Sequence, residues 1–124
     1  GSSGKECLQI NVKDKSAFGS FVQIPAVDGT IEKIEVTIRE PYKGRAIGIF
    51  PVGYTYTKDT LDKMKEQLAK DAIAISNETP SDVNNNEPFT FVIDNLSAKN
   101  LTQFSIFPTL GAVSITAITV TYSK

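Results

Sequence analysis

The chain has 124 residues, with 13 Lys plus Arg against 14 Asp plus Glu, one Cys, and neither His nor Trp. This length fits one domain, which would bury about two thirds of the surface that its unfolded chain exposes. Without His, the sequence excludes Ser-His-Asp and Cys-His catalytic relays and His-ligated zinc, and a single Cys excludes an internal disulfide and thiolate metal clusters. The net charge of -1 and the lack of a basic block argue against nucleic acid as a partner.

The two ends and the hydropathy of the chain set its expected domain organisation. Residues 1–5, which begin Gly-Ser-Ser-Gly, are small and polar, and we expect them to be a tether or a cloning remnant. Residues 6–124 are expected to form a single domain. The sequence lacks a run of 18 apolar residues, so it predicts no transmembrane segment.

Strands dominate the first half of the chain. The β-branched residues Ile, Val and Thr total 34 against 6 Leu, a bias that favours the pleated surface of a sheet over a helix interior. Alternating or continuous apolar patterns predict strands at 8–12, 18–24, 34–38 and 44–52, with a turn at 13–16 after the first. The last of these is apolar at nearly every position, so we expect it to be buried on both sides or bulged.

The spacing of apolar residues changes from a strand period to a helix period in the segment 59–70. Leu61, Met64 and Leu68 lie at i, i+3 and i+7, and Asp59 or Thr60 is placed to cap the helix. The segment therefore predicts one helix of about three turns, inserted in a β plan, whose narrow apolar stripe lies over one edge or mouth of a sheet. Residues 72–75 fit either an extension of this helix or a short strand, and we favour the strand.

The second half returns to strand patterns after a polar loop at 76–88. Strands are predicted at 89–93, 101–107 and 113–122, and the apolar parity of the last one switches near 116–118, which predicts a bulge or kink. Seven or eight short strands without a βαβ rhythm indicate an all-β, antiparallel β-sandwich, with a jelly roll as the expected topology. The first and last strands would then lie close, with both termini at one end.

The sequence gives only weak signals for residues that could carry out catalysis or hold a metal. The loop from Asp82 to Glu87 offers oxygen ligands at alternate positions but lacks the Gly and the distant bidentate Glu of a calcium loop, so we interpret it as a polar turn. Glu35 falls on the polar face of its predicted strand, and neither it nor its acidic neighbours Asp28, Glu32 and Glu40 are marked as buried. A thiolate nucleophile needs a nearby base or a helix N-terminus, and the sequence marks neither beside Cys7. We therefore predict that the protein is not an enzyme and has no metal site and no cofactor.

Aromatic side chains are the feature most suited to binding. Tyr54 and Tyr56 are two apart, so in an extended segment both rings face the same way, and Tyr42 lies in a turn near Lys43 and Arg45. Such rings could form a platform for the apolar face of a sugar, and we take Tyr42, Tyr54 and Tyr56 as candidate ligand-binding residues. The alternative is that these tyrosines cover the sheet or pack on the neighbouring helix. The missing Trp weakens the platform interpretation.

Two segments carry a resemblance to a known group of domains. Residues 21–38, with an apolar strand, Pro, a small residue, Asp-Gly and an alternating strand, resemble jelly-roll domains of secreted or surface lipoproteins of gut Gram-negative bacteria. Residues 101–107 and 113–122 are similar to the closing strand pair of those domains, whereas the helix around 61–70 departs from their usual short loop. The resemblance covers about half of the chain and includes no catalytic signature.

That resemblance implies a noncatalytic, uncharacterised domain of the carbohydrate-binding type. It also implies a secreted, periplasmic or outer-surface location, with a lipid anchor upstream of this chain. Two functions follow as hypotheses: a carbohydrate-binding module with a glycan partner, or a structural or protein-interaction domain with a protein partner and no small-molecule ligand. Fold alone does not decide between them.

Overall fold

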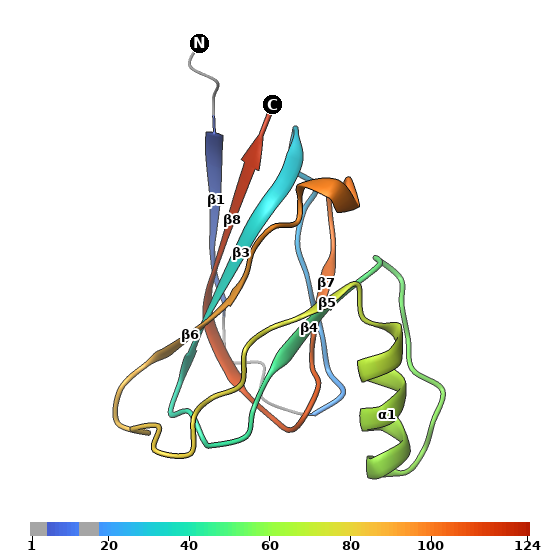
Figure 1. Cartoon of the computed structure of the whole chain (residues 1–124), viewed down its shortest axis with the longest axis vertical. Helices are drawn as coiled ribbons and strands as arrows, with labels where there is room; N and C mark the ends of the chain where they lie inside the picture. The colour runs from blue at the N-terminus through green and yellow to red at the C-terminus, as the bar shows by residue number, and fades with distance from the viewer. Residues whose placement is uncertain (1–4, 13–17) are drawn as a thin grey trace.

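Eight short strands and two helices make up the structure, a computed structural model that describes residues 5–12 and 18–124. The strands are β1 (Lys5–Asn11), β2 (Val22–Gln23), β3 (Thr30–Arg39), β4 (Ile47–Phe50), β5 (Ala74–Ile75), β6 (Phe89–Ile93), β7 (Ser105–Pro108) and β8 (Ser114–Ser123); the helices are α1 (Leu61–Asp71) and the 3-10 helix η1 (Ser97–Lys99). They form two four-stranded antiparallel sheets, with α1 beside the second sheet (Figure 1). This confirms the predicted all-β sandwich with one inserted helix.

The order of the strands identifies the topology. The first sheet has the order β1-β8-β3-β6 and the second β2-β7-β4-β5. The antiparallel pairs are nested: β4 pairs with β5, β3 with β6, β2 with β7 and β1 with β8, and successive pairs alternate between the sheets. A long hairpin wound over two sheets in this way is a jelly roll, as predicted.

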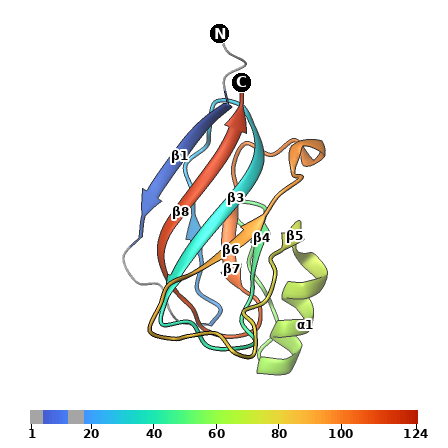
Figure 2. The ribbon, with the colours of Figure 1, turned by 60° about the vertical axis from the view of Figure 1, so that its left-hand side comes forward.

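The first and last strands lie side by side. Lys5 is opposite Ser123, and Asn11 is opposite Ala117. The start of β1 and the end of β8 therefore share one end of the sandwich (Figures 1 and 2). The end of β3, where Arg39 is opposite Ser114, lies at the other end. We call this second end the loop end.

The core lies between the sheets and is built mainly from β-branched side chains. On β3, Ile34, Val36 and Ile38 are fully buried and alternate with half-exposed residues, as the sequence predicts for residues 34–38. All four residues of β4 are buried, because Ile47 and Ile49 enter this core while Phe50 packs on the opposite face of its sheet. The expected strand that is buried on both sides is thus confirmed.

Two bulges keep these apolar residues on the inner face. Between β3 and β8, Thr37 is opposite Ala117 but Ile38 is opposite Ile115, so Thr116 is the extra residue on β8. The predicted irregularity near 116–118 is confirmed. A second shift makes Glu32 the extra residue on β3. Side chains alternate between the two faces of a strand, so one extra residue reverses the face of every residue after it. The extra residues thereby place Ile34 on β3 and Ile118 on β8 on the inner face, where both are buried.

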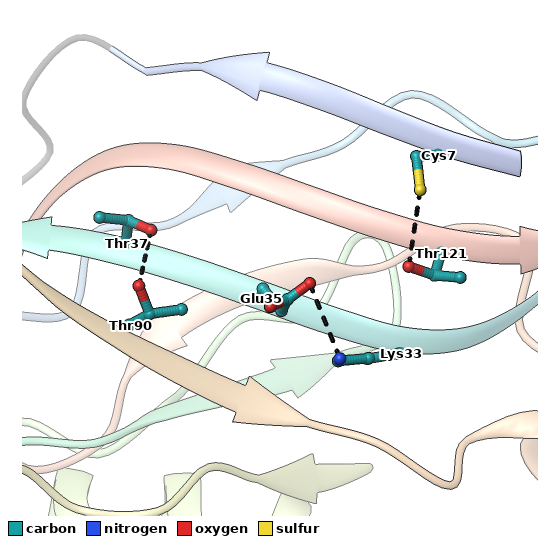
Figure 3. Close-up of polar contacts among 6 residues, drawn as sticks. All are labelled: Cys7, Lys33, Glu35, Thr37, Thr90 and Thr121. Carbon is teal, nitrogen blue, oxygen red and sulfur yellow. Dashed lines mark hydrogen bonds and ion pairs between the residues drawn. The ribbon is translucent and has the colours of Figure 1, made fainter.

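The outer face of the first sheet is polar. Thr37 and Thr90 share a hydrogen bond of 3.0 Å between β3 and β6, Lys33 lies 4.0 Å from Glu35, and the Cys7 thiol lies 3.8 Å from the Thr121 hydroxyl (Figure 3). Small hydroxyls and paired charges are typical of a sheet face in water. Glu35 is on this face, as its parity predicts.

Several element boundaries differ from the predicted ones. β1 begins at Lys5, inside the predicted tether, whereas residues 1–4 and the predicted turn at 13–16 lie outside the described residues. The strand predicted at 18–24 is reduced to Val22–Gln23, because Gly19 already lies in a turn with a φ of 91°. β4 and β7 are also shorter than predicted, whereas residues 72–75 contain the favoured strand, β5.

The helix begins at Leu61, directly after one of the two predicted capping residues, but without the predicted capping hydrogen bond. Thr60 occupies the N-cap position of α1 and its side chain makes no capping hydrogen bond. The side-chain oxygen of Gln67 instead accepts hydrogen bonds from the backbone N–H groups of Thr57 and Lys58, and it ties the approach segment to the helix. Within the described residues, no helix is long and apolar enough to cross a membrane.

Candidate binding site at the loop end

Tyr54 lies in a packed aromatic cluster on the outer face of the second sheet. Its ring stacks on Phe50 with centroids 4.7 Å apart and meets Phe107 edge-on at 5.6 Å. Its hydroxyl donates a hydrogen bond of 2.7 Å to the Asp71 carboxylate, at the end of α1. Burial, followed by this hydrogen bond and the carboxylate charge, raises the pKa of Tyr54 well above that of a free phenol. These contacts give Tyr54 a role in packing.

Tyr56 belongs to the same cluster. Its ring is edge-on to Phe107 at 6.4 Å, and its hydroxyl lies against Gly19, where a Cβ would come within 2.5 Å of it. Leu68 of α1 is fully buried against Phe50 and Phe107. We call Phe50, Leu68, Phe107, Tyr54 and Tyr56 the outer aromatic cluster.

The cluster follows from the sequence of β4 and β7. Phe50 and Phe107 are apolar side chains on the outer face of their sheet, and apolar surface of that size has to be covered. The segment 51–60 and α1 cover it. Tyr54 and Tyr56 are therefore half-buried, and the structure does not bring them together with Tyr42 into one exposed platform.

Tyr42 has a different setting, at the loop end between β3 and β4. Its side chain is 56% exposed. The backbone around it is fixed by Thr79, which is buried: the Thr79 hydroxyl donates to the Tyr42 carbonyl at 2.6 Å and accepts from the Arg45 backbone N–H at 2.8 Å. The turn is tied further by the bond from Gly44 N–H to the Thr79 carbonyl. An exposed ring thus sits on a firmly held turn.

Two depressions border this ring, and a third adjoins them. One, of about 140 Å³, is lined by Ile38, Arg39, Glu40, Pro41, Tyr42, Arg45, Ala112, Val113 and Ser114. A second, of about 270 Å³, is lined by Pro41, Tyr42, Lys43, Ser81, Val83 and Asn85. A third, of about 560 Å³, is lined by Arg39, Glu40, Asn85, Asn86, Glu87 and Pro88. The three depressions share lining residues and are therefore adjacent. We call the following residues the loop-end site: Arg39, Glu40, Tyr42, Lys43, Arg45 and Asn85.

The charged groups of this site are partly paired. Arg39 donates a hydrogen bond of 3.0 Å to the Glu40 carboxylate. Glu40 has a φ of 48°, an uncommon backbone conformation for a residue with a side chain, and Pro41 after it is buried. The Arg45 guanidinium lies 5.9 Å from the centroid of the Tyr42 ring. The site therefore offers one ring, several N–H donors and carboxylate and amide acceptors.

Groups that could hold a metal ion are sparse around this site. Among the described residues, no cluster of three or more potential metal-ligating side chains occurs. In the loop from Asp82 to Glu87, the Asn84 side-chain oxygen already accepts a hydrogen bond from the Asn86 backbone, as in a plain polar turn.

Sequence reasoning found Tyr42 and its basic neighbours but missed the residues that support them. Thr79 is 37 positions from Tyr42 in the chain, and Ala112 is 67 positions from Arg45. A polar residue in a loop gives no signal of such a distant partner. The nearest signal was the excess of basic residues beside Tyr42.

Comparisons with known proteins give distant likenesses only. No protein-family model and no curated protein matches the chain. Among solved structures, a chain from Bacillus endospore appendages, described as a family of disulfide-linked pili, shares 14% identity over 97% of this chain and 90% of that chain, with a TM-score of 0.41. A coat protein of Tobacco streak virus, solved as a dimer, shares 10% identity over 95% of this chain and 85% of that chain, with a TM-score of 0.44. Both TM-scores are below 0.5, and the jelly-roll assignment above depends on strand order and register alone.

Proposed function

We propose that the protein is a noncatalytic module that binds carbohydrate at the loop-end site, with Tyr42 as its central contact. One observation carries the proposal: an exposed tyrosine ring is held on a fixed turn between two depressions. The earlier hypothesis of a platform of three tyrosines is narrowed to Tyr42, because Tyr54 and Tyr56 are engaged in packing.

The chemistry of the site matches the two surfaces of a sugar. The face of an aromatic ring carries partial negative charge and attracts the polarised C–H groups of a pyranose. Hydroxyl groups beside the ring would meet donors and acceptors from Arg39, Asn85 and Glu40. With one ring and no deep pocket, we expect a weak interaction, with a Kd of about 1 mM for a short oligosaccharide.

Affinity electrophoresis against a panel of plant and mucin polysaccharides, followed by calorimetry, tests this proposal. We expect Tyr42→Ala to lose at least about 80% of the retardation, because the stacking contact is removed. Leu61→Ala is the matched control, since Leu61 has the same 56% exposure but lies on α1, outside the loop-end site. Absence of retardation by every polysaccharide, or equal retardation of both variants, would contradict the proposal.

A structural or protein-interaction domain is the second candidate function. The observation in its favour is β1, an edge strand that pairs with β8 on one side and has no described strand on the other. An open edge is a template for adding a strand from a partner. This function predicts a dimer or a partner complex in light scattering without affinity for sugars, and a monodisperse monomer indifferent to candidate partners would count against it.

The location that we propose for the module depends on the family resemblance alone. A secreted, periplasmic or outer-surface domain with a lipid anchor upstream would meet polysaccharides directly. Fractionation of cells and a search for a lipid-modified cysteine in the native precursor would test this proposal.

A further inference from the structure

We propose that the loop-end site takes a sugar that carries an oxyanion, either a uronate carboxylate or a sulfate ester, and that Arg45 binds this group. The inference rests on the proposed carbohydrate function and names its ligand class. It starts from the hydrogen bonds that Arg45 makes and from those that it leaves available.

Arg45 is half-buried at the loop end and is only partly used by the protein. Its Nε donates to the Ala112 carbonyl at 3.1 Å and its Nη1 to the Lys43 carbonyl at 3.5 Å. A guanidinium has five N–H donors, so these two bonds leave three without a partner among the described residues. In the part of the chain that the structure describes, Arg45 also forms no ion pair with a carboxylate.

The guanidinium is held in one orientation. It lies against the backbone of Gly111, where a Cβ would come within 2.8 Å of both Arg45 Cζ and Nε. The centroid of the Tyr42 ring lies 5.9 Å from Cζ. A planar fork that is fixed in this way is suited to paired hydrogen bonds with a carboxylate or sulfate, and little side-chain entropy remains to be lost on binding.

The charge around Tyr42 favours an anion. In the depression of about 140 Å³, Arg39 is paired with Glu40, which leaves the charge of Arg45 in excess. In the depression of about 270 Å³, Lys43 is the charged residue of the lining. Both depressions that border the ring therefore carry a positive excess, although the whole chain has a net charge of -1.

The size of the smaller depression limits what enters it. Sites for drug-sized molecules are usually about 300–1,000 Å³, so a volume of about 140 Å³ suits one charged substituent or one ring edge. We infer that the oxyanion enters beside Arg45 while the ring of the same or the next sugar lies on Tyr42. Lys43 would then face the continuing chain on the other side.

A pair of ligands that differ only in charge tests the inference without any change to the protein. Polygalacturonate and its methyl ester share a backbone, and a sulfated galactan and its desulfated form make the second pair. At low salt we expect the anionic member of at least one pair to bind about tenfold more tightly, and the pair that shows the difference identifies the oxyanion. We expect this preference to decrease as the salt concentration rises, because the screening of exposed charges increases.

Arg45→Gln is the matching change in the protein. We expect it to abolish the preference for the anionic ligand while binding of the neutral form is retained, and Lys63→Gln on the exposed surface of α1 serves as the charge-matched control. Circular dichroism would verify that both variants are folded. If Arg45→Gln does not fold, the ligand pairs still test the preference for the anionic sugar with the unchanged protein. Equal affinity for both members of both pairs would overturn the anionic preference but leave the carbohydrate function standing, whereas failure of all four ligands and of the neutral panel would overturn the carbohydrate function itself.

Discussion

The three candidate tyrosines, Tyr42, Tyr54 and Tyr56, show that the surroundings of a side chain decide its role. Tyr54 and Tyr56 lie over Phe107, so their rings complete an apolar surface. Beneath Tyr42 there is a polar turn that is tied together by Thr79, and its ring stays in water. One residue type therefore serves as packing at two positions and stays exposed at the third.

The hydroxyl of Tyr54 is expected to stabilise the fold. Tyr54→Phe keeps the ring but removes the donor to Asp71, and we expect the free energy of unfolding at pH 7 to fall by about 1 kcal/mol in urea denaturation. Tyr56→Phe is the control, because the Tyr56 hydroxyl has no hydrogen-bond partner in the described part of the chain, and we expect a change within about 0.5 kcal/mol. Equal losses in the two variants would show that the bond to Asp71 contributes nothing specific.

The same comparison has a pH dependence with a defined sign. Because the pKa of Tyr54 is raised in the folded state, its contribution is fully present below the pKa of a free tyrosine, about 10. Above that pH the unfolded chain ionises first and gains stability relative to the folded one. The difference between the native protein and Tyr54→Phe should therefore shrink as the pH rises above about 10, and a difference that grew would contradict the assigned cause.

At the scale of elements, the helix acts as a cover for the second sheet. Of its eleven residues, Leu68 alone is buried, and it enters the outer aromatic cluster. A helix this short is marginal by itself in water, so its stability must come from that contact and from the tie through Gln67. Sheet and helix therefore stabilise each other.

Two leucines of α1 allow a matched test of this role. Leu68→Ala should lower the free energy of unfolding by about 2–4 kcal/mol, because it leaves a cavity against Phe50 and Phe107. Leu61→Ala makes the same chemical change at a 56% exposed position of the same helix and should cost at most about 0.5 kcal/mol. Chemical denaturation measures both, and similar losses would show that the helix does not depend on the buried contact.

The sequence predicted elements well where one face is buried and poorly where the ends of strands are set by distant partners. Alternation located β3, and the parity switch located the bulge at Thr116, because both follow directly from which residues enter the core. The late starts of β2 and β7 depend on pairing across the sheet, which leaves little local trace. For the site, the turn sequence predicted that Tyr42 is exposed. The sequence could not show that Tyr54 is instead a packing residue, because this depends on its stacking on Phe50.

At the scale of the whole molecule, the nested pairing brings the two ends of the fold together. Lys5 and Ser123 are paired across β1 and β8, so neighbouring Cα atoms there are about 5 Å apart. The chain could be closed at this point with a short linker without moving either strand.

A circular permutant tests that view of the molecule. We expect a chain joined from residue 124 to residue 5 by a short Gly-Ser linker, and opened between Ala98 and Lys99, to fold with a melting temperature within about 10 °C of the native one, since η1 is exposed. Opening between Glu35 and Val36, in the middle of β3, should abolish cooperative unfolding. Thermal denaturation followed by circular dichroism separates the two cases, and failure of both would show that the β1–β8 junction cannot be bridged.

The pairing of β1 with β8 also bears on the order in which a ribosome makes the chain. Cys7 and Thr121, which are in contact across these strands, are 114 positions apart, so the first strand emerges long before its partner exists. β8 also joins β1 to β3, and until it is made the first sheet remains one lone strand beside the pair of β3 and β6. Unpaired apolar edges of this kind associate readily with other chains. Synthesis of β8 is therefore the step that joins β1 to β3 and covers the two strand edges that face each other across it, while the outer edge of β1 stays open among the described residues.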